Sequence, residues 1–158
     1  SEGKNVCLHW TFFNSDVWDF CNFFRQIDDP KLAKLTPKIE EKFKLKLKQE
    51  LQLDTQDESR LFPLLKTFSD KMKGYWDKYG SITSRLSAAV EKNETNDLDG
   101  LLMDLHAMRK SWTDSRWRLI NDVAYVLDKK QFARFLIFTE RIPEELRVIC
   151  NEISENSQ

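Results

Sequence analysis

Few side chains in this sequence have the type and spacing that catalysis requires. The chain has two histidines, His9 and His106, and it contains no glycine-rich phosphate loop, no nucleophile elbow and no His-Glu-x-x-His motif. Its many carboxylates lie in the ordinary charged stretches that are typical of solvated helix faces. The sequence therefore favours a binding, chaperone or sensor protein over an enzyme, and it implies no cofactor.

One short segment has the residue types of a transition-metal site. Met103 and His106 are three positions apart, so a helix places them on one face. A closed site usually needs about four to six ligands, and only His9 or a second copy of the chain could add a histidine. Met103 more often packs between helices, and His106 more often is exposed or hydrogen-bonded. Metal sensing through Met103 and His106 is kept as an alternative function.

Positive charge mixed with apolar groups is the pattern best suited to bind a partner. Residues 31–48 contain seven lysines and two acidic residues, and an apolar stripe runs between the lysines. A second basic cluster, at residues 109–118, lies beside two tryptophans. Charge speeds the encounter with an unfolded, acidic chain, and apolar contact then holds it. The predicted client-binding residues are Lys38, Lys42, Lys44, Lys46, Lys48, Phe43, Arg109, Arg116 and Trp117.

These basic segments also have plainer interpretations. The lysines could simply solvate an amphipathic helix, with their stems along its apolar stripe. Trp112 falls on an apolar helix seam and is expected in the core, whereas Trp117 falls off that seam and is expected at the surface. An aromatic and basic surface also suits single-stranded nucleic acid. The net charge of −1 argues against nucleic acid as the main partner.

Two long helices are predicted to carry the second basic cluster. Apolar residues recur at alternating steps of four and three from Leu61 to Ala89, and a similar seam runs from Leu98 to Val126. Such heptad seams indicate helices that pack lengthwise on one another. The polar segment 91–97 lies between them. We expect a long antiparallel hairpin of about 45 Å, at about 1.5 Å per residue.

Shorter apolar stripes predict the remaining helices. One spans residues 32–51, and it begins either at Pro37 after a Thr36 cap or seven residues earlier, at Asp29-Pro30. Another closes the chain at residues 132–153, with a kink or break expected near Arg141 because Pro143 follows.

The whole pattern predicts an all-α fold with four to five helices. We expect an aromatic-rich helical segment at residues 1–30, a single helical domain at 31–153 and a frayed tail at 154–158. No run of 18 apolar residues exists, so no transmembrane helix is predicted. No signal peptide is visible, which leaves export open.

The three cysteines, Cys7, Cys21 and Cys150, match no zinc or redox spacing. Free cysteines behave as small apolar residues, so burial is the first expectation for all three. One disulfide, such as Cys7 with Cys21, is the alternative.

Two helix starts in this sequence are alike. Leu53-Asp54-Thr55-Gln56-Asp57 precedes the first long seam, and Leu127-Asp128-Lys129-Lys130-Gln131 precedes the last helix. Asp54 or Thr55 in the first, and Asp128 in the second, have N-cap chemistry. Gln131, or Glu58 counted from Thr55, would complete a capping box.

This layout resembles the Spy/CpxP family of periplasmic stress chaperones and related metal sensors, in which two Leu-Thr-x-x-Gln motifs open helices. The resemblance covers residues 32–149 and is closest at 127–147. Asp replaces the motif's Thr in both copies, and Asp57 replaces Gln in the first.

The resemblance implies a curved antiparallel homodimer outside the inner membrane of Gram-negative bacteria. It also implies a protein that binds unfolded proteins, or modulates an envelope sensor, without ATP. A metal-resistance regulator and a structural helical adaptor are the alternatives.

Overall fold

The computed structural model describes residues 30–156, and this part of the chain is entirely helical. Its five helices are α3 (Pro30–Leu51), α4 (Thr55–Glu91), α5 (Leu98–Val126), α6 (Lys129–Glu140) and α7 (Ile142–Asn156). The prediction of an all-α fold is confirmed over this range. The predicted N-terminal segment, with His9, Cys7 and Cys21, lies outside the described residues.

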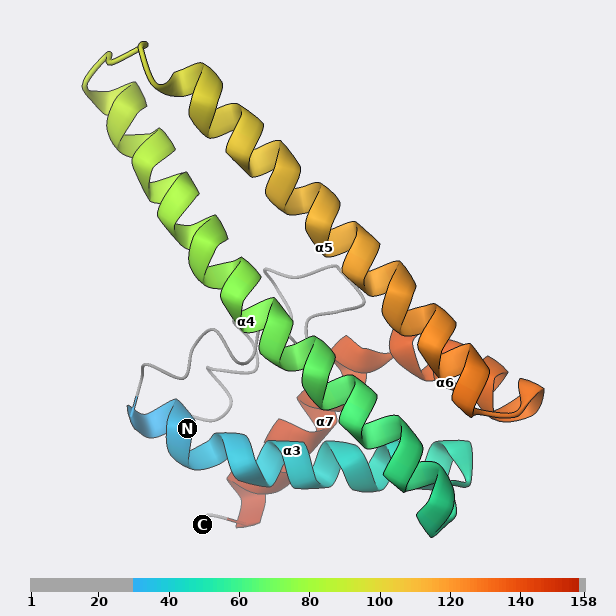
Figure 1. Ribbon diagram of the computed structural model, residues 1–158. Coiled ribbons are helices and arrows are strands. Elements are labelled where there is room, and N and C mark those ends of the chain that lie inside the picture. Colours follow the sequence, from blue (N-terminus) through green and yellow to red (C-terminus); the bar gives the residue numbers. More distant parts are fainter. Residues whose placement is uncertain (1–29, 157–158) are drawn as a thin grey trace.

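The two longest helices, α4 and α5, lie side by side and form what we call the arm (Figure 1). The other three helices pack around one end of it, which we call the base. The connection at residues 92–97 begins with a Schellman motif, since the amides of Glu94 and Asn93 donate to the carbonyls of Ala89 and Val90. Asn93 has a φ of 53°, a left-handed conformation that asparagine tolerates better than most residues.

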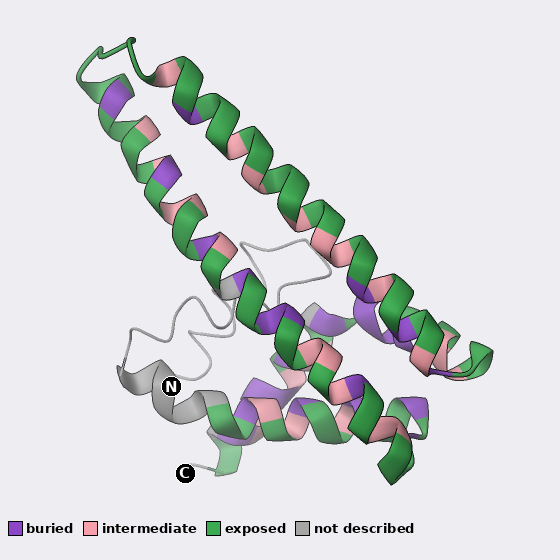
Figure 2. Ribbon diagram, viewed as in Figure 1, coloured by how far each residue is buried: buried purple, intermediate pink, exposed green. Residues whose placement is uncertain are grey.

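The base contains the main hydrophobic core. All five helices contribute to it, and Figure 2 shows how buried residues gather there. Phe43 on α3 and Phe138 on α6 pack edge to face, with ring centroids 5.5 Å apart. Along the arm, burial is restricted to the seam between α4 and α5. Near its far end only Ile82, Ala89 and Leu101 are buried, and they are separate from the main core.

The starts of α4 and α6 are both closed by capping boxes. The Asp54 carboxylate accepts from the Asp57 amide at 2.8 Å, and the Asp57 carboxylate accepts from the Asp54 amide at 3.1 Å. Asp128 and Gln131 make the same pair of bonds at 2.7 and 3.2 Å. The caps predicted at Asp54, Asp128 and Gln131 are confirmed. Thr55 is instead the first residue of α4, because Asp54 already occupies the cap position.

The two capping boxes also touch each other. The Gln131 side-chain amide donates to the Asp57 carboxylate at 2.9 Å, which joins the start of α6 to the start of α4. This bond, and then the bond from the Asp54 amide, holds the pKa of Asp57 below its usual value of 3.8. The two similar motifs therefore form one polar junction at the base.

Two proline predictions have different outcomes. The break near Arg141 is confirmed, since α6 ends at Glu140 and α7 begins at Ile142. The helix start at Pro37 is wrong, because α3 begins at Pro30 and contains Pro37. A proline inside a helix removes one backbone hydrogen bond. The Leu32 and Leu35 positions continue the apolar stripe in phase, which favours the longer helix.

Cys150 on α7 is buried and disulfide-bonded, so burial as a free thiol is the wrong prediction for this cysteine.

In the part of the chain that the structure describes, no helix combines the length and the apolar character that membrane crossing needs. α7 continues through Asn156, two residues beyond the start of the predicted tail.

Candidate partner-binding site

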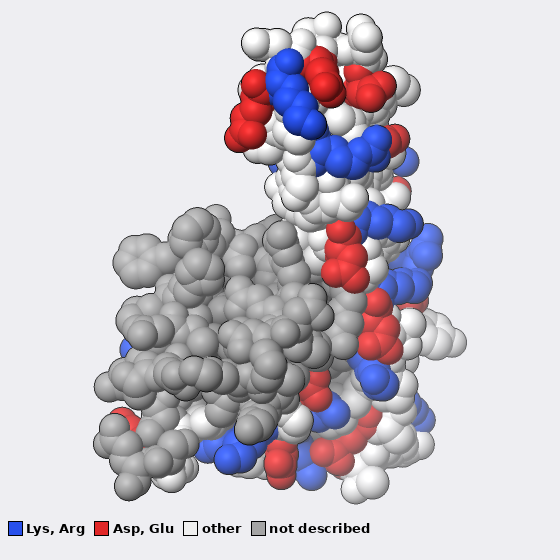
Figure 3. All heavy atoms as spheres, turned by 90° about the vertical axis from the view of Figure 1, so that its left-hand side faces the viewer, with Lys and Arg blue, Asp and Glu red and all other residues white. Residues whose placement is uncertain are grey.

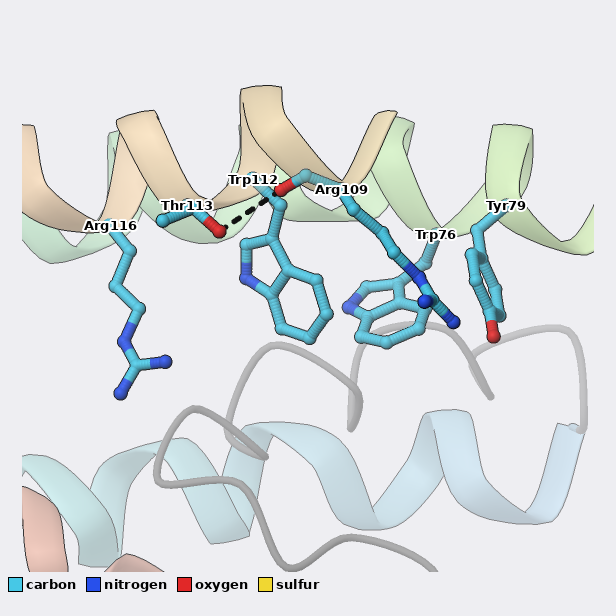
Figure 4. Close-up of a pocket in the computed structure, with 6 residues that line it drawn as sticks. All are labelled: Trp76, Tyr79, Arg109, Trp112, Thr113 and Arg116. Carbon is cyan, nitrogen blue, oxygen red and sulfur yellow. Dashed lines mark hydrogen bonds between the residues drawn. The ribbon is translucent and has the colours of Figure 1, made fainter. Parts of the chain in front are cut away.

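A pocket of about 290 Å³ opens on the arm between α4 and α5. Trp76 and Tyr79 line it from α4, and Arg109, Trp112, Thr113 and Arg116 line it from α5 (Figure 4). We call it the arm pocket. It contains aromatic faces and two cations, and none of its lining residues within 30–156 is acidic.

Helical spacing explains why these side chains meet. The four residues from α5 lie at positions i, i+3, i+4 and i+7, which form one stripe on a helix. Trp76 and Tyr79 are three positions apart on α4 and so also share a face. Packing of α4 on α5 brings the two stripes together.

The aromatic side chains form a rigid wall. The Trp76 and Trp112 rings pack with centroids 4.9 Å apart and an interplanar angle of 67°. Trp76 and Tyr79 pack at 5.3 Å and 82°. Both are edge-to-face arrangements, which favour fixed ring positions. Next to them, the Tyr75 and Ser115 hydroxyls form a 3.2 Å hydrogen bond that ties α4 to α5.

The polar groups of the arm pocket are mostly donors. The Thr113 hydroxyl donates to the Arg109 carbonyl at 3.1 Å (Figure 4). The Trp112 indole Nε1 is buried and meets no hydrogen-bond acceptor among residues 30–156. Arg109 forms no ion pair with any described residue. The pocket therefore offers positive charge to a ligand, while the Trp112 N–H stays buried behind its surface.

The lysine run of α3 has a different environment. Lys42 pairs with Glu152 at 3.1 Å, and Lys46 pairs with Glu145 at 3.2 Å. Figure 3 shows basic and acidic residues interleaved on the face of the molecule that it presents. These partly exposed pairs are each worth about 0–1 kcal/mol. They join α3 to α7, so these two lysines have a structural use.

Three further residues of the predicted client site lie on α3. Lys48 pairs with Glu58 of α4 at 3.2 Å. Lys44 is exposed, with its ammonium 5.8 Å from the centre of the Phe62 ring, and Lys38 is exposed as well. The structure thus does not gather these lysines into one basic face.

Phe43 lies in the core rather than at a contact surface. Only 4% of it is exposed, and it packs on Phe138. A partner cannot reach this ring in the folded protein, so its assignment as a client-binding residue is wrong. The reason is the helical stripe that Phe43 shares with Ile39 and Leu47, both also buried.

The predicted client-binding residues of α5, unlike Phe43, lie outside the core. Arg109 and Arg116 meet at the arm pocket, as their spacing on α5 requires. Trp117 does not line the pocket, but 61% of it is exposed, as expected from its place off the seam. Sequence reasoning missed Trp76 and Tyr79 as site residues. Their three-residue spacing places them on one face of α4, but only the packing of α4 on α5 shows that this face lines a pocket.

The possible metal ligands are not brought together. Met103 is 72% exposed, so packing between helices is wrong for this residue. His106 is exposed. Within residues 30–156, no group of three or more His, Cys, Asp or Glu side chains is placed to hold a metal ion.

No protein-family model, curated protein or solved structure matches this chain. The resemblance to the Spy/CpxP family thus rests on the helix starts at residues 53–57 and 127–131.

Proposed function

We propose that this chain is an ATP-independent binding module of the Spy/CpxP type that works in the bacterial periplasm. It holds unfolded proteins or modulates an envelope sensor, and it catalyses no reaction. The observation that carries this proposal is the arm pocket, where two arginines flank an aromatic wall.

The chemistry of the arm suits reversible capture of unfolded chains. Guanidinium groups attract acidic segments and can stack on aromatic rings, while the indole and phenol faces contact apolar side chains. Trp117 and Tyr125, on the same helix, are 61% and 91% exposed. Each ring offers apolar contact area and a polar group to a partner. Contacts of this kind are individually weak, so a client can leave and refold.

Two further observations support the family and the compartment. The paired helix caps at Asp54 and Asp128 lie at the two motifs that resemble those of the family, and the Gln131 to Asp57 bond links them. The disulfide at Cys150 supports an oxidising compartment, because such bonds persist in the periplasm and are reduced in the cytosol.

The proposal includes an antiparallel hairpin and a homodimer. Tyr75 contacts Ser115, and Trp76, later on α4, contacts Trp112, earlier on α5, as antiparallel helices require. Exposed apolar groups on α5, such as Leu102 and Tyr125, are available to a second copy. Sedimentation equilibrium of the full chain tests the dimer, and a monomer at all concentrations would contradict it.

The central experiment measures whether the full chain suppresses aggregation of a chemically denatured client, by light scattering. We expect protection at near-stoichiometric amounts that survives EDTA and weakens at high salt, because surface charge is screened. No protection would contradict the proposal and favour a structural adaptor. Protection that EDTA abolishes would favour the metal-sensing alternative.

A pair of variants locates the activity. Arg109→Gln together with Arg116→Gln removes both cations of the arm pocket and should abolish most of the protection. The matched control is Lys110→Gln together with Arg118→Gln, which removes two cations of α5 that do not line the pocket. Equal loss in both double variants would show that net charge acts, rather than the pocket.

A further inference from the structure

The arm pocket and the sequence of residues 10–24 have complementary compositions. The pocket combines aromatic rings with Arg109 and Arg116, and none of its lining residues within 30–156 is acidic. Residues 10–24 combine aromatic rings with Asp16 and Asp19, and this stretch contains no lysine or arginine. Its aromatic residues are Trp10, Phe12, Phe13, Trp18, Phe20, Phe23 and Phe24. So much apolar side-chain area needs a surface to pack against.

The arm pocket has room for one of these rings. Its volume is about 290 Å³, close to the lower limit of about 300–1,000 Å³ for pockets that hold drug-sized ligands. A ring in the pocket packs against aromatic faces, and the buried Trp112 N–H takes no part. Arg109 forms no ion pair with any described residue, so its guanidinium is available to a carboxylate close to that ring in sequence.

The length of chain before α3 is sufficient for this contact. The turn at residues 52–54 joins α3 to α4, and Pro30 and Trp76 each lie about 32 Å from it, at about 1.5 Å per residue. A right angle between these helices would place the two residues about 45 Å apart, and in Figure 1 both helices run from the turn towards the same side. The extended chain from Asp16 to Pro30 spans about 46 Å, at about 3.3 Å per residue.

The disulfide of Cys150 gives the N-terminal segment a second attachment. Cys7 and Cys21 are the only other cysteines of the sequence, so a disulfide within the chain joins one of them to α7. Residues 10–24 are therefore tethered both through Pro30 and through this bond. A short tether gives an effective concentration of about 1 mM at a nearby site. Contacts that would be weak between separate molecules are sufficient at that concentration.

We propose that the arm pocket is the docking site for residues 10–24 of the same chain. One aromatic ring of this segment fills the pocket, and the carboxylates of Asp16 and Asp19 pair with Arg109 and Arg116. The segment thereby occupies the surface that clients would use, and a client must displace it. The competition with clients rests on the proposed function, whereas the docking does not.

The test converts the ion pair into a covalent bond in the full-length, oxidised protein. Arg109→Lys keeps the positive charge and supplies an amine, which a water-soluble carbodiimide joins to a carboxylate in contact with it. We expect mass spectrometry of the digested monomer to find the introduced amine joined to Asp16 or Asp19. The control is the wild type, whose Lys110 pairs with Asp114 and should be joined to that residue instead.

Chymotrypsin, which cleaves after aromatic residues, gives an independent measure of docking. Cleavage within residues 10–24 should be slow in the wild type. It should be about tenfold faster when Arg109→Glu and Arg116→Glu are combined, because the pocket then repels the segment. Adding Asp16→Lys and Asp19→Lys reverses both signs and should restore slow cleavage. Circular dichroism of each variant reports whether it is folded.

The matched control for cleavage combines Lys110→Glu with Arg118→Glu. It changes the net charge by the same amount at two α5 residues that do not line the pocket, so the cleavage rate should stay that of the wild type. Equal acceleration in this control would overturn the inference, since net charge alone would then release the segment.

The cross-link can overturn the inference in two ways. One is that the introduced amine is not joined to any residue of the segment 10–24. The other is a cross-link found only between two copies of the chain, which would make the segment of a second copy the occupant. Neither measurement includes a client, so failure of the docking is distinguishable from failure of the chaperone proposal.

Discussion

Three lysines of α3, at positions 42, 46 and 48, pair with glutamates of α4 and α7, whereas Arg109 and Arg116 of α5 line an aromatic pocket. Both segments are basic in sequence, and both include aromatic residues. On α3 the aromatic residue, Phe43, is in the core. On α5 the tryptophans are half-buried or exposed. The same composition thus stabilises the fold in one place and forms a candidate contact surface in the other.

The difference comes from what each helix packs against. α3 packs against α6 and α7, and acidic residues of α7 lie opposite its lysines. α5 packs mainly against α4, so its other faces remain exposed along the arm. A basic run therefore indicates a binding surface only when its neighbours leave the charge available to a partner.

The largest expected effect separates the two regions by stability. Phe43→Ala should lower the free energy of unfolding by about 3–5 kcal/mol, because it leaves a cavity in the core. Trp117→Ala should change it by less than about 0.5 kcal/mol, because the ring is exposed. Urea unfolding followed by circular dichroism measures both. A small effect for Phe43→Ala would contradict its place in the core.

The next effect separates the regions by binding. Arg109→Gln should raise the amount of protein needed for half-maximal protection of a client about tenfold, with unfolding free energy nearly unchanged. Aggregation assays and thermal unfolding of the same samples measure the two quantities. Unchanged protection by this variant would remove Arg109 from the contact surface.

A smaller effect is expected on α3, where a variant should change the unfolding free energy and leave the protection of a client unchanged. Lys46→Gln breaks the ion pair with Glu145 and should lower the unfolding free energy by up to about 1 kcal/mol, while protection stays unchanged. The Glu145→Gln variant, alone and combined with Lys46→Gln, completes a double-mutant cycle. A zero coupling energy in the cycle would show that this pair does not stabilise the base.

The smallest effect concerns acid stability of the base. Since the folded pKa of Asp57 is lowered, its ionised form stabilises the fold above pH 3.8, and this contribution is lost as the pH falls further. Gln131→Ala removes the largest cause and should raise that pKa towards its usual value. The difference in melting temperature between wild type and variant should shrink at low pH, down to the part caused by losing the Asp128 to Gln131 cap bond. Gln56→Ala, at an exposed site in the other motif, is the control.

Much of the fold was predictable because it depends on local pattern. The heptad seams predict α4 and α5, and the capping residues Asp54 and Asp128 mark helix starts to within one residue. The start of α3 was less certain because both Asp29-Pro30 and Thr36-Pro37 have cap chemistry. The longer helix keeps its apolar stripe despite the proline.

The site was less predictable because it depends on contacts distant in sequence. Nothing near Lys42 or Lys46 indicates that Glu152 or Glu145 lies opposite. Trp76 joins the arm pocket only through packing with Trp112. The disulfide of Cys150 is likewise a distant contact that spacing alone does not predict.

The most direct test is to map, residue by residue, where a denatured client contacts the full-length protein. Amide signals of the ¹⁵N-labelled chain would be compared before and after addition of a client that stays unfolded. We expect the changes to concentrate around residues 76–79 and 109–117, with residues 38–48 of α3 nearly unaffected. Changes centred on α3, with the arm unaffected, would contradict the assignment of the arm pocket as the contact site.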